Sequence, residues 1–293
     1  MKTKLFALLA FFLGTHLYVN SQTTSDPLGT GLLWEISGNG LKKKSYVLGT
    51  IHIIPEKDYF FPKYYTKALK ATEVIVMEIN MTDILGQLEV IKMSKLPDGK
   101  ELKDFYDERT YQEIVDVARD SFGVNIEMIK TMKPIFIQQQ LSTNEMMTGT
   151  MMSYEMELVK MGMQMDKSFD GLETAKEQMT ILDSISLEEQ ATMLLESIRN
   201  VKQENADMDK LIQFYKDQQL DSLNALFEKG DYDLADHENS LLGNRNRKWI
   251  PQMEAFMKKA PIFFAVGAGH LGGNQGVINL LRQKGYTVTP ITK

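Results

Sequence analysis

The sequence contains no cysteine among its 293 residues. This absence excludes disulfide bonds, thiolate metal sites and a lipid-modified cysteine. Histidine is scarce as well: apart from His16, near the N-terminus, the chain has only His52, His237 and His270. Because imidazole carries protons and binds metal ions near neutral pH, the position of each of these three side chains is informative.

The chain also lacks an excess of basic residues. It has 33 lysines and arginines against 39 aspartates and glutamates, and its formal net charge is −6. A chain this acidic, without a basic stripe, is poorly suited to nucleic acid or to anionic membranes, so we expect neither as a partner. The hydrophobic fraction of 43% is that of an ordinary globular domain with a sizeable core.

The N-terminal apolar run, residues 5–13, is only nine residues long. It is too short to span a bilayer. Two lysines precede it and a small-residue pair, Val19 and Ser21, follows it, which is typical of a secretory signal peptide over residues 1–21. We therefore expect cleavage near Gln22 and a periplasmic or secreted chain with no membrane span. An uncleaved anchor is the alternative.

The two ends of the chain have the hydrophobic pattern of an α/β fold. A polar lead-in at 22–31 is expected to be flexible. The run VIVMEI at 74–79 is typical of a strand buried on both faces, and the first two strands are expected to pair through a Ser-Gly-Asn-Gly turn. The predicted strands are 32–36, 45–48, 74–79, 168–172, 262–266 and 286–291, and the predicted flanking helices are 62–71 and 275–284, the second ended by Gly285.

The middle of the chain, about 101–259, is mostly helical by periodicity. A capping box over Thr174–Glu177 is expected to begin one of its helices. We interpret residues 32–293 as one domain with a helical insertion. The predicted breaks between helices fall near Pro134, Gly149, Gly162 and Gly230.

A weak internal repeat links the two ends. The succession of strand, Gly-x-x-His, helix and strand occurs at Tyr46–Ile79 and again at Ile262–Ile291. Each unit predicts a pair of parallel strands joined by a right-handed crossover. The expected fold class is therefore α/β, with mixed α+β character and a central sheet built from two β-α-β units.

Three polar side chains follow the carboxyl ends of predicted strands. His52 and His270 occupy equivalent places in the two units, and Glu78 ends the apolar run VIVM. Ligands of open α/β sheets bind beyond these strand ends, so we expect the three to meet at one edge. Two imidazoles and a carboxylate can hold a divalent metal, with manganese, cobalt or zinc as candidates. Without a metal, the same groups can act as a His/Glu general-base pair.

Other candidates have simpler explanations. Arg245 and Asn246 can bind a carboxylate or an oxyanion, but with their basic neighbours they also fit a solvated helix face. Glu173 is interpreted as a helix N-terminal charge rather than a catalytic acid. His237 lies between acidic residues and is expected at the surface. The eight methionines of 146–165 most simply fill core gaps, with an adaptable peptide-binding surface or a copper site as alternatives.

Several stretches together resemble the TraB/GumN family, which includes the animal TIKI proteins. They are YVLGTIH, VIVMEINMTD, MKPIFIQQQL, GLETAKEQ, LLGNRNRKWI and FFAVGAGHLGGNQGVINLLRQKGYTV, spread from about Leu33 to Ile291. The resemblance implies a sheet of two repeated units with helical additions, and a divalent-metal-dependent protease. The family's motif residues fall on Gly49, His52, Glu78, Arg245, Asn246, Gly267 and His270.

The sequence thus predicts an exported metal-dependent hydrolase, a peptidase with a peptide or protein substrate. His52, Glu78 and His270 are the expected catalytic and metal-binding residues, with Arg245 and Asn246 orienting substrate or stabilising an oxyanion. Gly49 and Gly267 are structural motif residues. The alternatives are a non-catalytic protein that sequesters a peptide and a metal-independent esterase with a His/Glu base.

Overall fold

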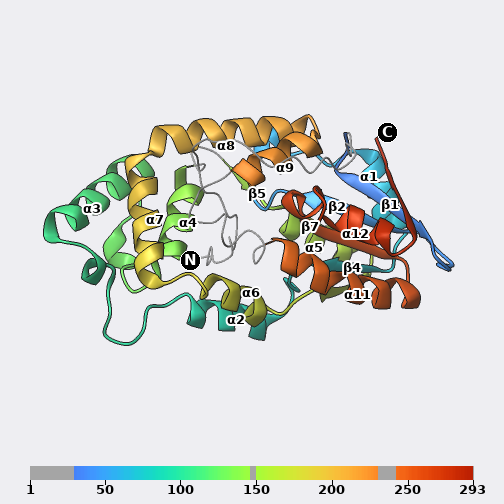
Figure 1. Ribbon diagram of the computed structural model, residues 1–293, viewed down its shortest axis with the longest axis horizontal. Coiled ribbons are helices and arrows are strands. Elements are labelled where there is room, and N and C mark those ends of the chain that lie inside the picture. Colours follow the sequence, from blue (N-terminus) through green and yellow to red (C-terminus); the bar gives the residue numbers. More distant parts are fainter. Residues whose placement is uncertain (1–29, 146–149, 230–241, 293) are drawn as a thin grey trace.

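The computed structural model describes residues 30–292 apart from 146–149 and 230–241 (Figure 1). Several predictions lie outside these residues: the signal peptide, most of the lead-in, the breaks at Gly149 and Gly230, and His237. In the described ranges, no helix is both long enough and apolar enough to cross a membrane.

A mixed six-stranded sheet forms one half of the molecule, which confirms the predicted α/β class. Five strands run in one direction, and β1 runs antiparallel to both of its neighbours. In spatial order the strands are β6 (Ser168–Gly171), β4 (Val74–Met77), β7 (Ile262–Gly267), β2 (Ser45–Thr50), β1 (Leu33–Gly38) and β8 (Tyr286–Pro290).

The predicted hairpin of β1 and β2 is confirmed, with Leu33 opposite Leu48. Its turn requires left-handed backbone, since φ is 79° at Gly38, 45° at Asn39 and 79° at Gly40. Glycine and asparagine adopt such angles at little cost, so the Ser-Gly-Asn-Gly sequence determines where the chain reverses.

The two strands of each repeated unit are parallel, as predicted, but they are not neighbours in the sheet. β2 and β4 are parallel, but β7 lies between them; β7 and β8 are also parallel, but β2 and β1 separate them. The units are therefore interleaved. β7 is buried over Ile262–Val266, and the centre of the sheet is the place where a strand apolar on both faces is covered on both sides.

Helices cover both faces of this sheet (Figure 1). Alternate strand residues divide between two apolar clusters: Leu48 and Phe263 belong to one, and Val47 and Phe264 to the other. The first face is covered by α1 (Lys63–Lys70) and α5 (Tyr154–Gln164), and the second by α11 (Asn244–Lys259) and α12 (Val277–Gln283).

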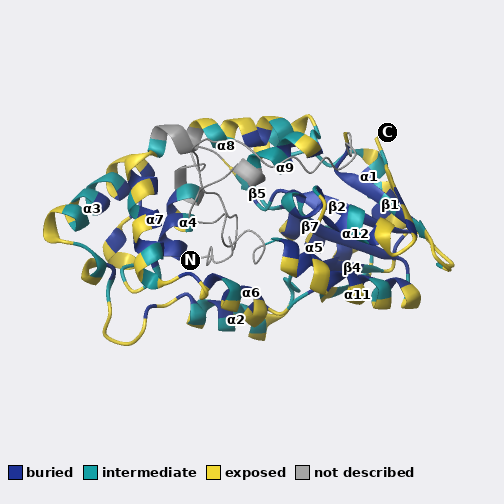
Figure 2. Cartoon of the chain, in the orientation of Figure 1, coloured by how far each residue is buried: buried dark blue, intermediate teal, exposed yellow. Residues whose placement is uncertain are grey.

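The remaining helices form a second half with two apolar clusters of its own, neither of which contains a strand residue (Figures 1 and 2). These helices are α2 (Ile84–Met93), α3 (Glu108–Phe122), α4 (Pro134–Glu145), α6 (Ala175–Leu182) and α7 (Leu187–Arg199). Two further helices, α8 (Val201–Lys216) and α9 (Leu220–Lys229), return to the sheet and bury Leu211, Tyr215 and Leu223 against it.

Short elements complete the chain. The strands β3 (Ile54–Pro55) and β5 (Met151–Met152) pair antiparallel, and together they join the loop after β2 to the segment before α5. Single turns of 3₁₀-helix are η1 (Glu56–Asp58), η2 (Leu102–Phe105), η3 (Ile126–Met128) and η5 (Ala268–His270).

Local signals mark several of the helix ends. The capping box at Thr174 and the left-handed Gly285 after α12 are confirmed, and α4 begins at Pro134. The predicted break near Gly162 is found at Gln164, where α5 ends, so Gly162 itself is still helical. A methyl group there would lie 2.6 Å from both Ile75 and Phe169, so glycine allows the helix to pack closely on the sheet.

Candidate functional site

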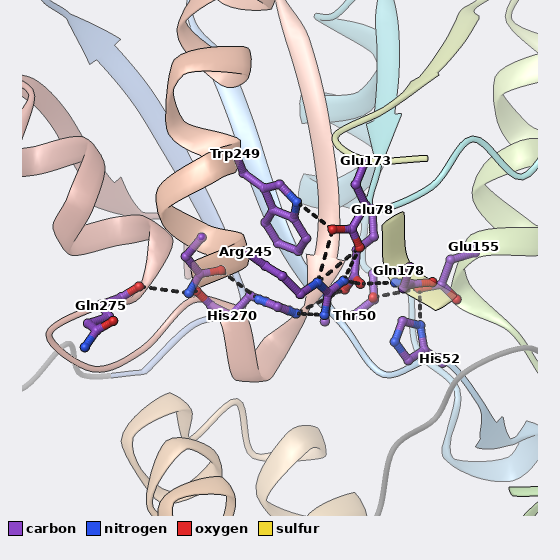
Figure 3. A network of polar contacts seen from close by, with 12 residues as sticks. Thr50, His52, Glu78, Glu155, Glu173, Gln178, Arg245, Trp249, His270 and Gln275 are labelled. Atoms are coloured by element: carbon purple, nitrogen blue, oxygen red, sulfur yellow. Dashed lines mark hydrogen bonds and ion pairs between the residues drawn. The ribbon is translucent and has the colours of Figure 1, made fainter. Parts of the chain in front are cut away.

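The candidate site lies at the edge where β2, β7 and β4 end. The three strands are parallel, with Thr50 beside Gly267 and Met77 beside Ala265. Glu78 follows β4 directly, His52 follows β2 by two residues, and the single turn of η5 carries His270 back from β7. Figure 3 shows the side chains turned toward one another.

Gly267 is the point around which these side chains meet. A methyl group on it would lie 3.3 Å from Glu78 Oε1, 3.7 Å from His270 Cδ2 and 3.7 Å from His52 Nε2. The structure therefore brings the three predicted residues together. The backbone N–H of Gly267 donates to Glu78 Oε1 at 2.8 Å. Glycine at this position leaves room for the three groups and supplies a hydrogen bond.

Gly49, the glycine of the first motif, has a packing role. A methyl group on it would lie 2.7 Å from Leu271 Cδ1 and 3.1 Å from the backbone of Ala268. Approaches this short require neighbouring atoms to move. Glycine at this position lets the end of β2 approach η5 closely, which brings the two Gly-x-x-His segments against each other.

Glu78 is buried and anionic. Gly267 and Gln178 donate to it, the latter from Nε2 to Oε2 at 3.1 Å, and Arg245 Nη2 lies 2.5 Å from Oε2. Burial opposes the charge, but Arg245 and the two histidines hold the pKa of Glu78 well below its usual range. A buried carboxylate with these partners is fully hydrogen-bonded and a weak base.

Arg245, in the first turn of α11, links Glu78 to Glu173. Its Nε and Nη2 donate to Glu173, and its guanidinium lies 4.8 Å from the centre of the Trp249 ring. Burial raises the pKa of Glu173, although Arg245 and Trp249 Nε1 bond to it. The Glu173 side chain thus bonds to α11, whereas the side chain that caps α6 is that of Thr174.

His270 is held by α11 at both ring nitrogens. Nδ1 lies 2.7 Å from Asn246 Oδ1, and Nε2 lies 3.0 Å from Arg245 Nη1. A guanidinium can only donate, so Nε2 accepts and Nδ1 carries the proton. Burial, opposed by Glu78 but aided by Arg245, lowers the pKa of His270 to about 3. His270 is therefore neutral at physiological pH.

Asn246 also fixes the loop after His270, because its Nδ2 donates to the carbonyl of Gln275 at 2.8 Å. Asn246 and Arg245 are both buried, so the solvated-face interpretation is wrong for them. It holds for Arg247 and Lys248, which are exposed.

His52 differs from His270 in its partner. Its Nδ1 lies 3.0 Å from Oε1 of Glu155, and its side chain is 26% exposed. Burial opposes a charge on the ring, but the Glu155 carboxylate outweighs it and raises the pKa of His52 to about 9. Among the residues that the structure describes, Nε2 has no hydrogen-bond partner, and it faces Gly267.

Two site residues were missed by the sequence analysis. Gln178 lies within the stretch GLETAKEQ, which was singled out for its family resemblance, so a signal existed. Glu155 had none: it follows the N-cap of α5 inside the methionine-rich segment. In that segment Met152, Met161 and Met165 pack against the sheet's core, while Met156 and Met163 are exposed, which agrees only in part with core filling.

A family model for the TraB/PrgY/gumN family matches residues 32–290. The chain belongs to this family. It is 22% identical to "Metalloprotease TIKI2" of Danio rerio over 87% of the chain and 60% of that protein, and 23% identical to "Metalloprotease TIKI1" of the same species over 87% and 62%. It is 22% identical to "Metalloprotease TIKI2" of Xenopus tropicalis over 96% and 66%.

The chain thus spans less than two thirds of the length of these relatives. No solved structure matches it.

The predicted metal ligands can be tested against the geometry. In both histidines Nδ1 is bonded to an oxygen, which leaves Nε2 as the nitrogen that faces the site. The Nε2 atom of His270 lies 3.7 Å from Glu78 Oε1. However, the guanidinium of Arg245 bonds to Glu78 Oε2 and His270 Nε2. Across the described ranges, no group of three or more histidines, cysteines or carboxylates could hold a metal ion. The predicted trio does not fit a metal in this arrangement.

Proposed function

We propose that this TraB-family chain is an exported hydrolase that cleaves an amide or ester bond in a peptide or protein. The single observation that carries the proposal is the state of His52: one ring nitrogen is bonded to a carboxylate, and the other has no partner among the described residues and faces Gly267, beside Glu78. This is the arrangement that proton transfer to a bound substrate requires. The relatives named metalloproteases support a protein substrate.

His52 carries the proton in this proposal. During hydrolysis the oxygen of water bonds to the carbonyl carbon, and the bond to the leaving group breaks. The leaving group takes a proton from Nε2 of His52, and the attacking water returns one to the same nitrogen. Glu78, fixed in its charged state by Arg245 and Gln178, stabilises the imidazolium without taking up a proton itself.

Arg245, Asn246 and His270 hold this arrangement in the proposal. The donors of Arg245 are directed at Glu78, Glu173 and His270, so we assign it to fixing Glu78 rather than to orienting substrate. Asn246 fixes the ring of His270. The neutral His270 accepts from Arg245 and keeps that guanidinium beside Glu78.

A divalent ion, manganese, cobalt or zinc, is the cofactor that the relatives' names suggest. It would have to compete with Arg245 for Glu78 and His270. The geometry as it stands favours the metal-independent alternative, in which His52 and a carboxylate transfer the proton. Chelation distinguishes the two: loss of turnover with a chelator, and its return with one of these ions, would establish the metal.

The test is a screen of the purified chain against a peptide library and a set of simple esters, with and without chelator. His52→Ala, Glu78→Gln and His270→Ala should each reduce turnover at least a hundredfold, while Lys248→Ala, an exposed position on α11, should match the wild type. Binding of a peptide without cleavage, with affinity unchanged in the three variants, would instead support a sequestering protein.

Export is part of the same proposal. A signal peptide over residues 1–21 would place the mature chain in the periplasm or outside the cell, as one domain over 32–293. N-terminal sequencing of the protein from its host should find Gln22 first; a mature protein that begins at Met1 in the cytoplasm would contradict export.

A further inference from the structure

Glu155 is a buried carboxylate that lies outside the two Gly-x-x-His motifs yet touches the site. Three side chains donate to it: Thr50 Oγ1 at 2.8 Å and His52 Nδ1 at 3.0 Å to Oε1, and Ser153 Oγ at 3.2 Å to Oε2. Its side chain is 11% exposed. A carboxylate at this depth is stable only with such partners, so its position is closely determined.

The backbone around Glu155 is tied to the backbone around His52. In the β3–β5 pair Ile54 lies opposite Met152, and the N–H of Glu56 donates to the carbonyl of Thr150 at 2.8 Å. On the other side, the hydroxyl of Tyr154 donates to the carbonyl of Phe60 at 2.8 Å. The chain after His52 is thus bonded on both sides of Glu155, which fixes the distance between the two side chains.

The two motif histidines differ in what supports them. The Nδ1 partner of His270 is the neutral amide of Asn246, and its Nε2 is engaged by Arg245. The Nδ1 partner of His52 is a carboxylate, and its Nε2 is open among the described residues. A carboxylate stabilises an imidazolium far more than a neutral amide does, because it carries a full negative charge. Of the two motif histidines, His52 is therefore the one with a carboxylate at Nδ1 and a free Nε2 among the described residues.

We propose that Glu155 is the positioning residue of His52: it holds the proton on Nδ1 and directs Nε2 at the centre, so that proton exchange takes place at Nε2 alone. This inference rests on the proposed hydrolase function. In this proposal the segment 150–155 orients the imidazole of His52 at the ends of the strands.

Three variants test the proposal. Glu155→Gln keeps the shape and removes the charge, and should lower kcat by about 10²- to 10⁴-fold with KM within about threefold. Thr50→Val removes one donor to Glu155 in a buried place and should lower kcat by about tenfold. Glu157→Gln is the matched control, since Glu157 lies on the same helix and pairs only with Lys160 in the described part of the chain; it should match the wild type.

A second readout does not depend on turnover. Nitrogen-15 NMR of the histidine rings should find Nδ1 of His52 protonated throughout in the wild type. In Glu155→Gln the neutral His52 ring should populate the form protonated at Nε2. Unchanged His52 signals in a folded Glu155→Gln variant would overturn the proposal, whether or not a substrate is known.

The two readouts separate the proposal from the function beneath it. If His52→Ala is inactive and Glu155→Gln keeps wild-type kcat, Glu155 does not position the ring and the proposal is overturned alone. If His52→Ala keeps wild-type kcat, the hydrolase mechanism fails, and with it any catalytic effect of Glu155. Loss of kcat in Glu155→Gln together with altered His52 signals supports both.

Discussion

Arg245 Nη1 lies 3.0 Å from Nε2 of His270. This contact determines the chemistry of the second motif, because a ring nitrogen that accepts from a guanidinium can neither take up a proton nor coordinate a metal at the same time. The two Gly-x-x-His motifs, alike in sequence, therefore hold their imidazoles in different states.

Removing this guanidinium should be costly. Arg245→Met leaves Glu78 and Glu173 buried without their shared cation, and breaking a buried ion pair typically costs about 3–5 kcal/mol. Urea unfolding should report a loss of this size, against a change of less than about 0.5 kcal/mol for the exposed Lys248→Ala. A loss below about 1 kcal/mol in Arg245→Met would contradict the pairing.

The same substitution tests the competition between Arg245 and a metal. With Glu78 Oε2 and His270 Nε2 released, a folded Arg245→Met variant should bind zinc or cobalt at least tenfold more tightly than the wild type, measured by calorimetry. His270→Ala placed on top of it should abolish the gain. Equal affinity in wild type and Arg245→Met would mean that the guanidinium does not block the predicted ligands.

The two motif glycines should separate stability from activity. Gly49→Ala forces a methyl group against Leu271 and the backbone of Ala268, and overpacking of this kind typically costs about 1–3 kcal/mol. Gly267→Ala places its methyl 3.3 Å from Glu78 Oε1. It should therefore lower kcat while the unfolding midpoint stays close to that of the wild type. If both variants lost kcat and unfolding free energy to the same extent, the two glycines would not have these separate roles.

Stability without metal should depend on pH through both histidines, which titrate near 6.5 when unfolded. The pKa of about 9 for folded His52 gives stabilisation that is complete below about pH 6.5 and lost as pH rises to about 9. The pKa of about 3 for folded His270 means that the unfolded chain binds more protons between about pH 3 and 6.5, so stability falls with falling pH there.

These opposite slopes place the maximum contribution of the pair near pH 6.5. Urea unfolding in chelator across pH 5–9 should show the alkaline decline in the wild type and a flatter curve in His52→Gln. An alkaline decline of the same size in His52→Gln would assign it to other groups.

Local patterns were enough to find the strands of the sheet and the edge at which the candidate site lies. VIVM and IFFAV are apolar at every position, which marks the buried strands that Glu78 and His270 follow, and His52 follows the shorter apolar run of β2. The order of the strands in the sheet could not be predicted from the sequence. The same apolar pattern fits β7 beside β2 alone and β7 between β2 and β4. The helix α2 was missed, since Ile84, Leu85 and Leu88 are exposed and blur its periodicity.

Contacts between distant parts of the chain set the limit for the site. Glu155 reaches His52 across 103 residues and Gln178 reaches Glu78 across 100. Glu155 has no local feature that marks it, and Gln178 is marked only by its place in the stretch GLETAKEQ. Arg245 was placed near the site by its family resemblance, but its bonds to Glu78, Glu173 and His270 depend on how α11 packs against the sheet.

The most direct test of the account is the turnover of His52→Ala on a peptide or ester that the wild type cleaves, measured with and without added imidazole. If Nε2 of His52 carries the proton, kcat should fall at least a hundredfold and free imidazole should restore part of it, while Lys248→Ala is unaffected by either change. Wild-type kcat in a folded His52→Ala variant would contradict the account.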